Sequence, residues 1–124
     1  MIIFDSNIWI AYLNKSDSTH EQAIDKFAKT NVDDIVMTEY LLLEIVTVLK
    51  QIQGYEFSQN FIQHIENIPF LESKNFYAQT LALFQSLKEN KLSFVDVSLL
   101  YLSQNYEIET FDKELQKMIQ QNNK

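Results

Sequence analysis

The first fourteen residues, Met1 to Asn14, read MIIFDSNIWIAYLN, and the arrangement of the whole chain follows from them. Three apolar residues after Met1 stop at Asp5, and apolar residues then recur from Ile8 onward at helical spacing. A short apolar run closed by a turn residue is typical of a buried strand in a parallel sheet. We therefore expect a strand that ends at Asp5, followed by a helix. Asp5 would lie at the carboxyl edge of the sheet, where open α/β sheets bind ligands.

The remainder of the chain repeats this alternation of strand and helix. Short apolar runs at residues 35–37, 69–71 and 106–110 predict further strands, and most of the sequence between them has helical periodicity. Such alternation predicts a three-layer α/β/α fold, with helices on both faces of a short parallel sheet of four to five strands. With 124 residues, the chain is expected to form a single domain, residues 1–124.

Several helix boundaries can be predicted from local signals. Residues 39–53 are apolar around most of the helix circumference, so we expect a central helix, capped by Thr38 and ended at Gly54, the only glycine. Ser18 is expected to cap the second helix, and a long helix is expected at 73–90. We expect the aromatic side chains of the first helix, Trp9 and Tyr12, to be buried in the core rather than to form an interface.

The composition excludes several kinds of site. The chain has no cysteine and no arginine, and 17 acidic residues outnumber 10 lysines, which gives a net charge of −7. A disulfide or a thiolate metal site is therefore impossible, and the basic stripe typical of nucleic-acid binders is missing. Phosphate groups would have to meet a metal ion, helix N-termini or lysines. The lysines near predicted helix ends are Lys15, Lys50, Lys91 and Lys113.

The N-terminus has no basic segment, and Asp5 interrupts its apolar run, so it does not have the pattern of a signal peptide. The longest apolar stretch, residues 40–49, contains Glu44 and is too short to span a bilayer. We therefore expect a soluble protein of the cytoplasm that does not bind membranes.

Four carboxylates stand out, and each also has an ordinary structural explanation. Asp5 and Asp112 can cap the helices that follow them. Asp96 can complete a capping box with Ser93. Glu44 can belong to a polar helix face that meets water, or that face can line a cleft. Taken one at a time, the structural explanations are at least as good as the functional ones.

Taken together, the four carboxylates predict a metal site. Asp5, Glu44, Asp96 and Asp112 each lie at or near a point where a helix begins, and in a parallel sheet these points share one edge. Carboxylates gathered there would repel one another and resist ionisation without a counter-charge. Mg²⁺ prefers oxygen ligands and commonly binds through carboxylates together with a substrate phosphate.

In this order the motifs resemble those of the PIN domain, the metal-dependent ribonuclease domain of VapC-type toxins. The matching positions are the turn Asp5-Ser6-Asn7, Glu44 in the helix after the second strand, Asp96 at the start of a later helix, and the T-x-D motif Thr110-Phe111-Asp112. The resemblance covers essentially the whole chain. The absence of arginine is a departure, since such toxins often place arginine around the cleft.

The resemblance implies an endoribonuclease that depends on Mg²⁺ or Mn²⁺. Asp5 and Asp96 would be the primary ligands, and Glu44 and Asp112 would complete the cluster. The resemblance also implies an RNA substrate, a small antitoxin protein as partner, and a homodimer. Polar residues that would support the carboxylates or touch phosphate, unless they are only caps and turn residues, are Ser6, Asn7, Ser93 and Thr110.

Other interpretations remain open at this stage. The chain could be a PIN-type nuclease of RNA processing that has no antitoxin, or an inactive relative that works as a binding module. It could also be a plain structural domain whose acidic residues are all helix caps. Phosphatases of the HAD type fit less well, because their second aspartate would fall at Asn7.

Overall fold

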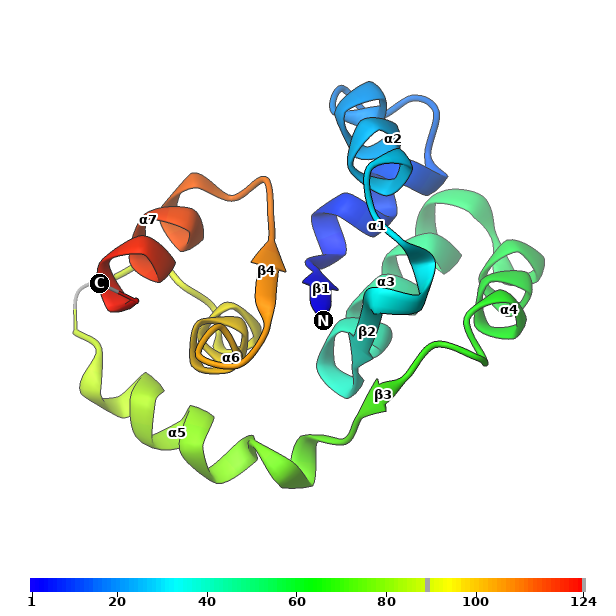
Figure 1. The fold of residues 1–124 in the computed structure, drawn as a ribbon. Helices are drawn as coiled ribbons and strands as arrows, with labels where there is room; N and C mark the ends of the chain where they lie inside the picture. The colour runs from blue at the N-terminus through cyan, green and yellow to red at the C-terminus, as the bar shows by residue number, and fades with distance from the viewer. Residues whose placement is uncertain (89, 124) are drawn as a thin grey trace.

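The chain is built around a small parallel sheet, seen in a computed structural model that describes residues 1–88 and 90–123. Neighbouring strands follow the order β3-β2-β1-β4, and every pair in the sheet is parallel (Figure 1). The strands are β1 (Ile2–Phe4), β2 (Ile35–Thr38), β3 (Phe70–Leu71) and β4 (Glu107–Glu109).

Two groups of helices flank this sheet (Figure 1). In the first group α1 packs on α2 and α3, and α3 packs on α4; in the second, α6 packs on α5 and α7. The expected three-layer α/β fold is confirmed. The described residues form seven α-helices and two short 3-10 helices: α1 (Ser6–Leu13), α2 (His20–Ala28), η1 (Val32–Asp34), α3 (Glu39–Gln53), α4 (Tyr55–His64), η2 (Ser73–Asn75), α5 (Tyr77–Ser86), α6 (Phe94–Leu102) and α7 (Lys113–Asn122).

Strand β1 holds the centre of the sheet. Ile3 pairs with Val36 of β2 on one side and with Ile108 of β4 on the other, and both Ile3 and Phe4 are fully buried. Because the strands are parallel, the carboxyl ends of β1, β2 and β4 meet at one edge. Helices α1, α3 and α7 begin directly beyond these three ends.

Helix α3 begins and ends as the sequence predicts. Thr38 Oγ1 accepts a hydrogen bond from the backbone N–H of Leu41, and Gly54 ends the helix with a φ of +93°. The expectation that α3 is central is only partly right. Its buried stripe is made of Leu41, Ile45 and Leu49, whereas the side chain of Leu43 is 61% exposed.

Three local expectations are wrong. Ser18 does not cap α2, since the residue before this helix is Thr19. The N–H and the hydroxyl of Thr19 both donate to Asp17 Oδ1. The helix expected at 73–90 is interrupted at Phe76, whose φ of −141° is not helical and whose ring is buried. The helix α5 then ends at Ser86, and residue 89 of the expected range lies outside the described residues. Tyr12 is 39% exposed and stacks on Phe27, while Trp9 is buried as expected.

A helix that crosses a bilayer has to be long and apolar. Within 1–88 and 90–123, no helix is long and apolar enough to cross a membrane.

Candidate active site

Asp5 lies at the carboxyl end of β1, where it is the N-cap of α1 and only 4% exposed. Its backbone N–H donates to the carbonyl of Glu109 in β4, over 2.9 Å, so the residue is fixed between the two strands. Its carboxylate accepts hydrogen bonds from the backbone N–H of Ser6, at 2.7 Å, and from the hydroxyl of Thr110, at 2.7 Å. The predicted cap is therefore present, but Thr110 holds the other oxygen from a distant part of the sequence.

Thr110 connects three of the residues that the sequence singled out. Its hydroxyl donates to Asp5 and accepts hydrogen bonds from the side-chain amide of Asn7, at 3.2 Å, and from the backbone N–H of Asp112, at 3.1 Å. Asn7 in turn accepts from the backbone N–H of Phe111 at 3.2 Å. This network joins the turn after β1 to the T-x-D motif after β4, so both motifs of the sequence belong to one site.

Glu44 reaches the same site through Ser6. The Ser6 hydroxyl donates to Glu44 Oε1 by a short hydrogen bond, although the two residues are 38 positions apart. Glu44 is half-buried in the second turn of α3, beside a hollow that it shares with Val48 and Val95. The Glu44 carboxylate therefore does not simply meet water, whereas Thr47 and Gln51 of the same helix face are exposed, and the hollow next to Glu44 is largely apolar.

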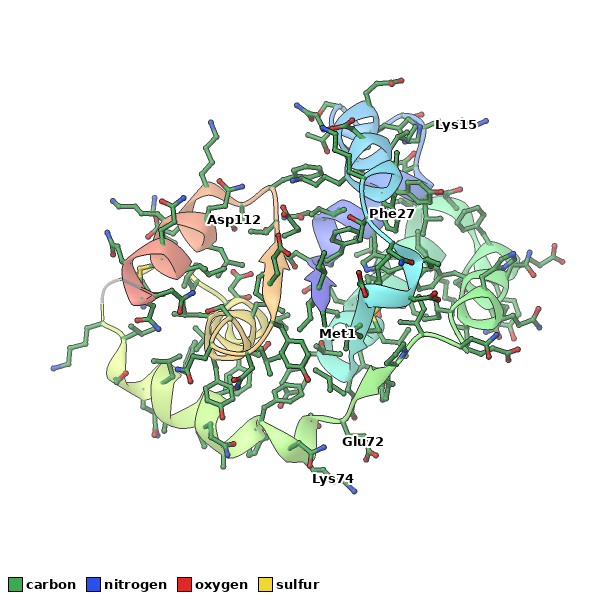
Figure 2. All side chains as sticks on the ribbon, in the orientation of Figure 1. Met1, Lys15, Phe27, Glu72, Lys74 and Asp112 are labelled. Atoms are coloured by element: carbon green, nitrogen blue, oxygen red, sulfur yellow. The ribbon has the colours of Figure 1, made fainter. Side chains whose placement is uncertain are left out.

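The carboxylates of Asp96 and Asp112 both cap the N-terminus of a helix. Asp96 accepts from the backbone N–H of Ser93 at 3.0 Å, while its own N–H donates to the Ser93 hydroxyl, which is the predicted capping box. Asp112 accepts from the backbone N–H of Leu115 at 3.1 Å as the N-cap of α7. Figure 2 shows Asp112 where the loop after β4 turns into α7.

The electrostatics of Asp5 show that three of the acids share one environment. Burial raises the pKa of Asp5 to about 6, although the hydrogen bonds from Thr110 and Ser6 lower it. The negative charges of Asp96 and Glu44 raise the same pKa further. The groups that lower this pKa are neutral hydrogen-bond donors, so within residues 1–88 and 90–123 no cationic side chain balances the charge of Asp5.

The four acids fit a hard divalent cation by their chemistry, but they do not form a finished coordination shell. Within residues 1–88 and 90–123, no three acidic, histidine or cysteine side chains lie close enough together to hold one ion. Asp96 and Asp112 each accept a hydrogen bond from the backbone of their own helix end instead, and Glu44 accepts one from the Ser6 hydroxyl. The atoms that could bind a metal ion are all carboxylate oxygens, which are the ligands that Mg²⁺ and Mn²⁺ prefer. The buried charge of Asp5 also favours a nearby cation.

A basic residue near the site was missed in the sequence. The ammonium of Lys26, on α2, lies 2.8 Å from Glu109 Oε2 and 5.9 Å from the ring centroid of Phe111. It is therefore close to the T-x-D motif, whereas Lys50 lies over Tyr55 where α3 meets α4. The position of Lys26 depends on how α2 packs, so no local pattern could have indicated it.

The structure resembles two solved structures over nearly their whole lengths. The first is VapC20 of Mycobacterium tuberculosis, described as a toxin that cleaves the sarcin–ricin loop; it is 19% identical, with a TM-score of 0.81 and coverage of 94% of each chain. The second is FitAcB of Neisseria gonorrhoeae, 12% identical with a TM-score of 0.68, covering 97% of this chain and 94% of that one. Both similarities concern the fold.

Sequence comparisons give a family but no individual relative. A search of curated protein sequences found no match. The family model of the PIN domain matches residues 2–119, which include all four carboxylates and every polar residue hydrogen-bonded to Asp5. Since this match spans almost the entire chain, the chain belongs to the PIN domain family.

Proposed function

We propose that this chain is a metal-dependent endoribonuclease that hydrolyses RNA phosphodiester bonds and acts as the toxin of a toxin–antitoxin pair. The observation that carries the proposal is the environment of Asp5. This carboxylate is buried at the carboxyl edge of the sheet, and the charges of Asp96 and Glu44 reach it. The PIN family match supports a nuclease, and the likeness to the VapC20 toxin supports RNA as substrate.

Asp5 and Asp96 would be the primary ligands of Mg²⁺ or Mn²⁺, and Glu44 and Asp112 would complete the acidic cluster. When bound, such an ion lowers the pKa of a water molecule and neutralises charge on the phosphate. The protein supplies positioning. Thr110 fixes the orientation of the Asp5 carboxylate through its hydroxyl.

The other polar residues hold the remaining carboxylates. Ser6 holds Asp5 through its backbone N–H and Glu44 through its hydroxyl. Ser93 holds Asp96, and Asn7 ties Thr110 to the loop at Phe111. These contacts restrict each side chain to a few orientations before substrate arrives, which is how supporting residues tune a metal site.

The net charge of −7 gives the cation a second role. An acidic site without a cation repels a phosphate backbone, whereas the loaded site attracts it. RNA binding is therefore expected to weaken when EDTA removes the divalent ion.

Two protein partners belong to the same proposal. An acidic site that cuts RNA in its own host needs a partner that silences it, and a small antitoxin would do so by laying a peptide across the carboxylates. A second copy of the chain is the other partner, because α3 leaves Leu43 exposed.

Cleavage of a structured RNA pool with Mg²⁺ or Mn²⁺ tests the proposal. The parent chain is compared with Asp5→Asn and Asp96→Asn, since asparagine caps a helix nearly as well as aspartate but carries no charge. Asp33→Asn, an exposed acid in η1, is the matched control. We expect the parent and the control to cut RNA and both site variants to lose more than 100-fold in rate, with melting temperatures unchanged or raised.

The result is read from activity and stability together. An inactive parent, together with site variants that melt at lower temperature, would mean that the carboxylates are only helix caps. The toxin role is tested separately by inducing the chain in cells. Growth arrest by the parent but not by Asp96→Asn supports it, whereas normal growth with an active nuclease supports a role in RNA processing.

A further inference from the structure

A hollow of about 520 Å³ lies between α2 and the beginning of α7, beside the acidic site. Its position is fixed by two contacts described above. Phe111, in its wall, stands between Thr110 and Asp112, and its backbone N–H is held by Asn7. Lys26, also in its wall, pairs with Glu109, whose carbonyl accepts from the N–H of Asp5. The residues that line it are Glu21, Gln22, Asp25, Lys26, Phe111 and Gln116.

The side chain of Phe111 gives this hollow an aromatic wall. The residue is half-buried, so part of its ring remains open, and its neighbours in the sequence belong to the acidic site. An accessible aromatic ring in a nuclease is a platform on which a nucleobase can stack, and each such contact strengthens binding roughly five-fold or more.

The polar groups around the ring indicate which base would fit. The Asp25 carboxylate is paired with Lys29 at 2.8 Å, whereas Glu21 takes part in none of the ion pairs of the described residues. A free carboxylate can accept two parallel hydrogen bonds, and guanine is the base that offers two adjacent donors, N1–H and the 2-amino group. Lys26 can donate to the O6 and N7 acceptors of the same base.

We propose that this hollow binds an unpaired guanine of the RNA, stacked on Phe111 and read by Glu21, next to the phosphate to be cut. The inference rests on the proposed function, because it assigns a base preference to that nuclease. It also explains how a chain with no arginine orients RNA. Stacking and base contacts replace the basic surface that the composition lacks.

An arginine side chain from a partner peptide is the alternative occupant of an acidic, aromatic hollow. Lys26 argues against it, since its ammonium lies in the wall of the same hollow, where it would repel a guanidinium. The amide of Gln22 also suits a base edge, which carries both donors and acceptors, whereas Gln116 Nε2 already donates to the carbonyl of Thr110 at 2.6 Å.

Titration with mononucleotides tests the hollow without any cleavage. Guanosine, inosine and adenosine 5′-monophosphates are added to the parent chain with Mg²⁺, and backbone amide signals are followed by NMR. Inosine lacks only the 2-amino group. We expect GMP to bind at least five-fold more tightly than IMP or AMP, with the largest shifts at Glu21 and Phe111.

Matched variants show which side chains contact the guanine base. Phe111→Leu keeps an apolar side chain against the core and should weaken GMP binding at least five-fold, while Phe111→Trp should retain it. Glu21→Gln should abolish the preference for GMP over IMP. Phe70→Leu and Glu114→Gln, which change residues of the same types in β3 and α7 outside the hollow, should change neither.

Equal affinity for GMP and IMP, or unchanged GMP binding by Phe111→Leu, would overturn the proposal. Tighter binding of N-acetylarginine amide than of GMP, measured by displacement of GMP from the hollow, would also overturn the proposal. Selective GMP binding by a chain that cuts no RNA would refute the nuclease and leave the guanine site standing. RNA cleavage without GMP selectivity would refute the guanine site alone.

Discussion

At the scale of single residues, Asp5 serves two purposes that conflict. As the N-cap of α1 it stabilises the fold, with the Ser6 N–H at 2.7 Å. As a buried anion near Asp96 and Glu44 it costs stability, and its pKa rises to about 6. A buried carboxylate with a raised pKa is common at functional sites, which supports the proposed role of Asp5.

The raised pKa of Asp5 gives a dependence of stability on pH. Between about pH 4 and 6 the unfolded chain has lost the proton that the folded chain still holds, so the free energy of unfolding falls as pH rises through this window. Asp5→Asn removes this effect. We expect this variant to be more stable than the parent by about 1–3 kcal/mol at pH 7, and the gain to vanish near pH 4.

Urea unfolding at both pH values, without divalent ions, measures this difference, and Asp33→Asn serves as the control with no gain at either pH. A gain of the same size at pH 4 and pH 7 would show that the Asp5 carboxyl titrates normally in the folded chain.

At the scale of elements, Gly54 decides where α3 ends and α4 begins. Its φ of +93° with ψ of 170° lies in a region that only glycine adopts readily. Apart from the adjoining backbone, no atom of the described residues lies within 4 Å of the position of an added Cβ. Gly54→Ala is therefore expected to cost about 1–3 kcal/mol of stability through backbone strain alone, with no steric clash.

Thermal unfolding of Gly54→Ala measures that cost, with Gln51→Ala, an exposed residue of the same helix, as the control. RNA cleavage should be unaffected well below the melting temperature. The acidic site adjoins the beginning of α3, next to Thr38, whereas Gly54 lies at the other end of this helix. A melting temperature equal to that of the parent would mean that the turn adapts.

The elements also show which features the sequence could predict. Thr38, Gly54 and the Ser93–Asp96 capping box were predicted correctly, because each acts on backbone groups within four residues. The four strands were predicted because short apolar runs are local patterns. Phe76 broke an expected helix because burial of its ring in the core outweighed a continuous helical pattern.

The candidate site was predicted only in outline. Parallel strands bring the carboxyl ends together, so the shared edge of Asp5, Glu44 and Asp112 followed from topology. The contact of Ser6 with Glu44 and the position of Lys26 over Phe111 join residues 38 and 85 positions apart. Such contacts depend on how whole helices pack, which local sequence patterns do not specify.

At the scale of the whole molecule, an apolar surface extends across two helices that flank the sheet. Leu43 on α3 is 61% exposed, and Tyr77 and Phe84 on α5 are 50% and 41% exposed. Both rings of α5 lie against Phe94, which also lies against Tyr40 of α3, and Leu43 lines the same hollow as Tyr40. Exposed apolar groups that cluster in this way mark interfaces.

We expect the chain to form a homodimer through this surface. Light scattering should give about twice the chain mass of 14.7 kDa. Leu43→Lys should shift the mass toward that of the monomer, because a charge would be buried in the interface. Val32→Lys, at a residue that is 64% exposed in η1, should leave the dimer intact. A monomeric parent, or dissociation by both variants alike, would contradict the proposed interface.

The pairing of β1 with β4 has a consequence for how the molecule is made. Asp5 is among the first residues to leave the ribosome, while Glu109 and Thr110, which fix its backbone and carboxylate, are among the later ones. The site cannot form while a nascent chain still lacks these residues. The proposed nuclease would therefore gain its assembled site only after translation has passed the T-x-D motif.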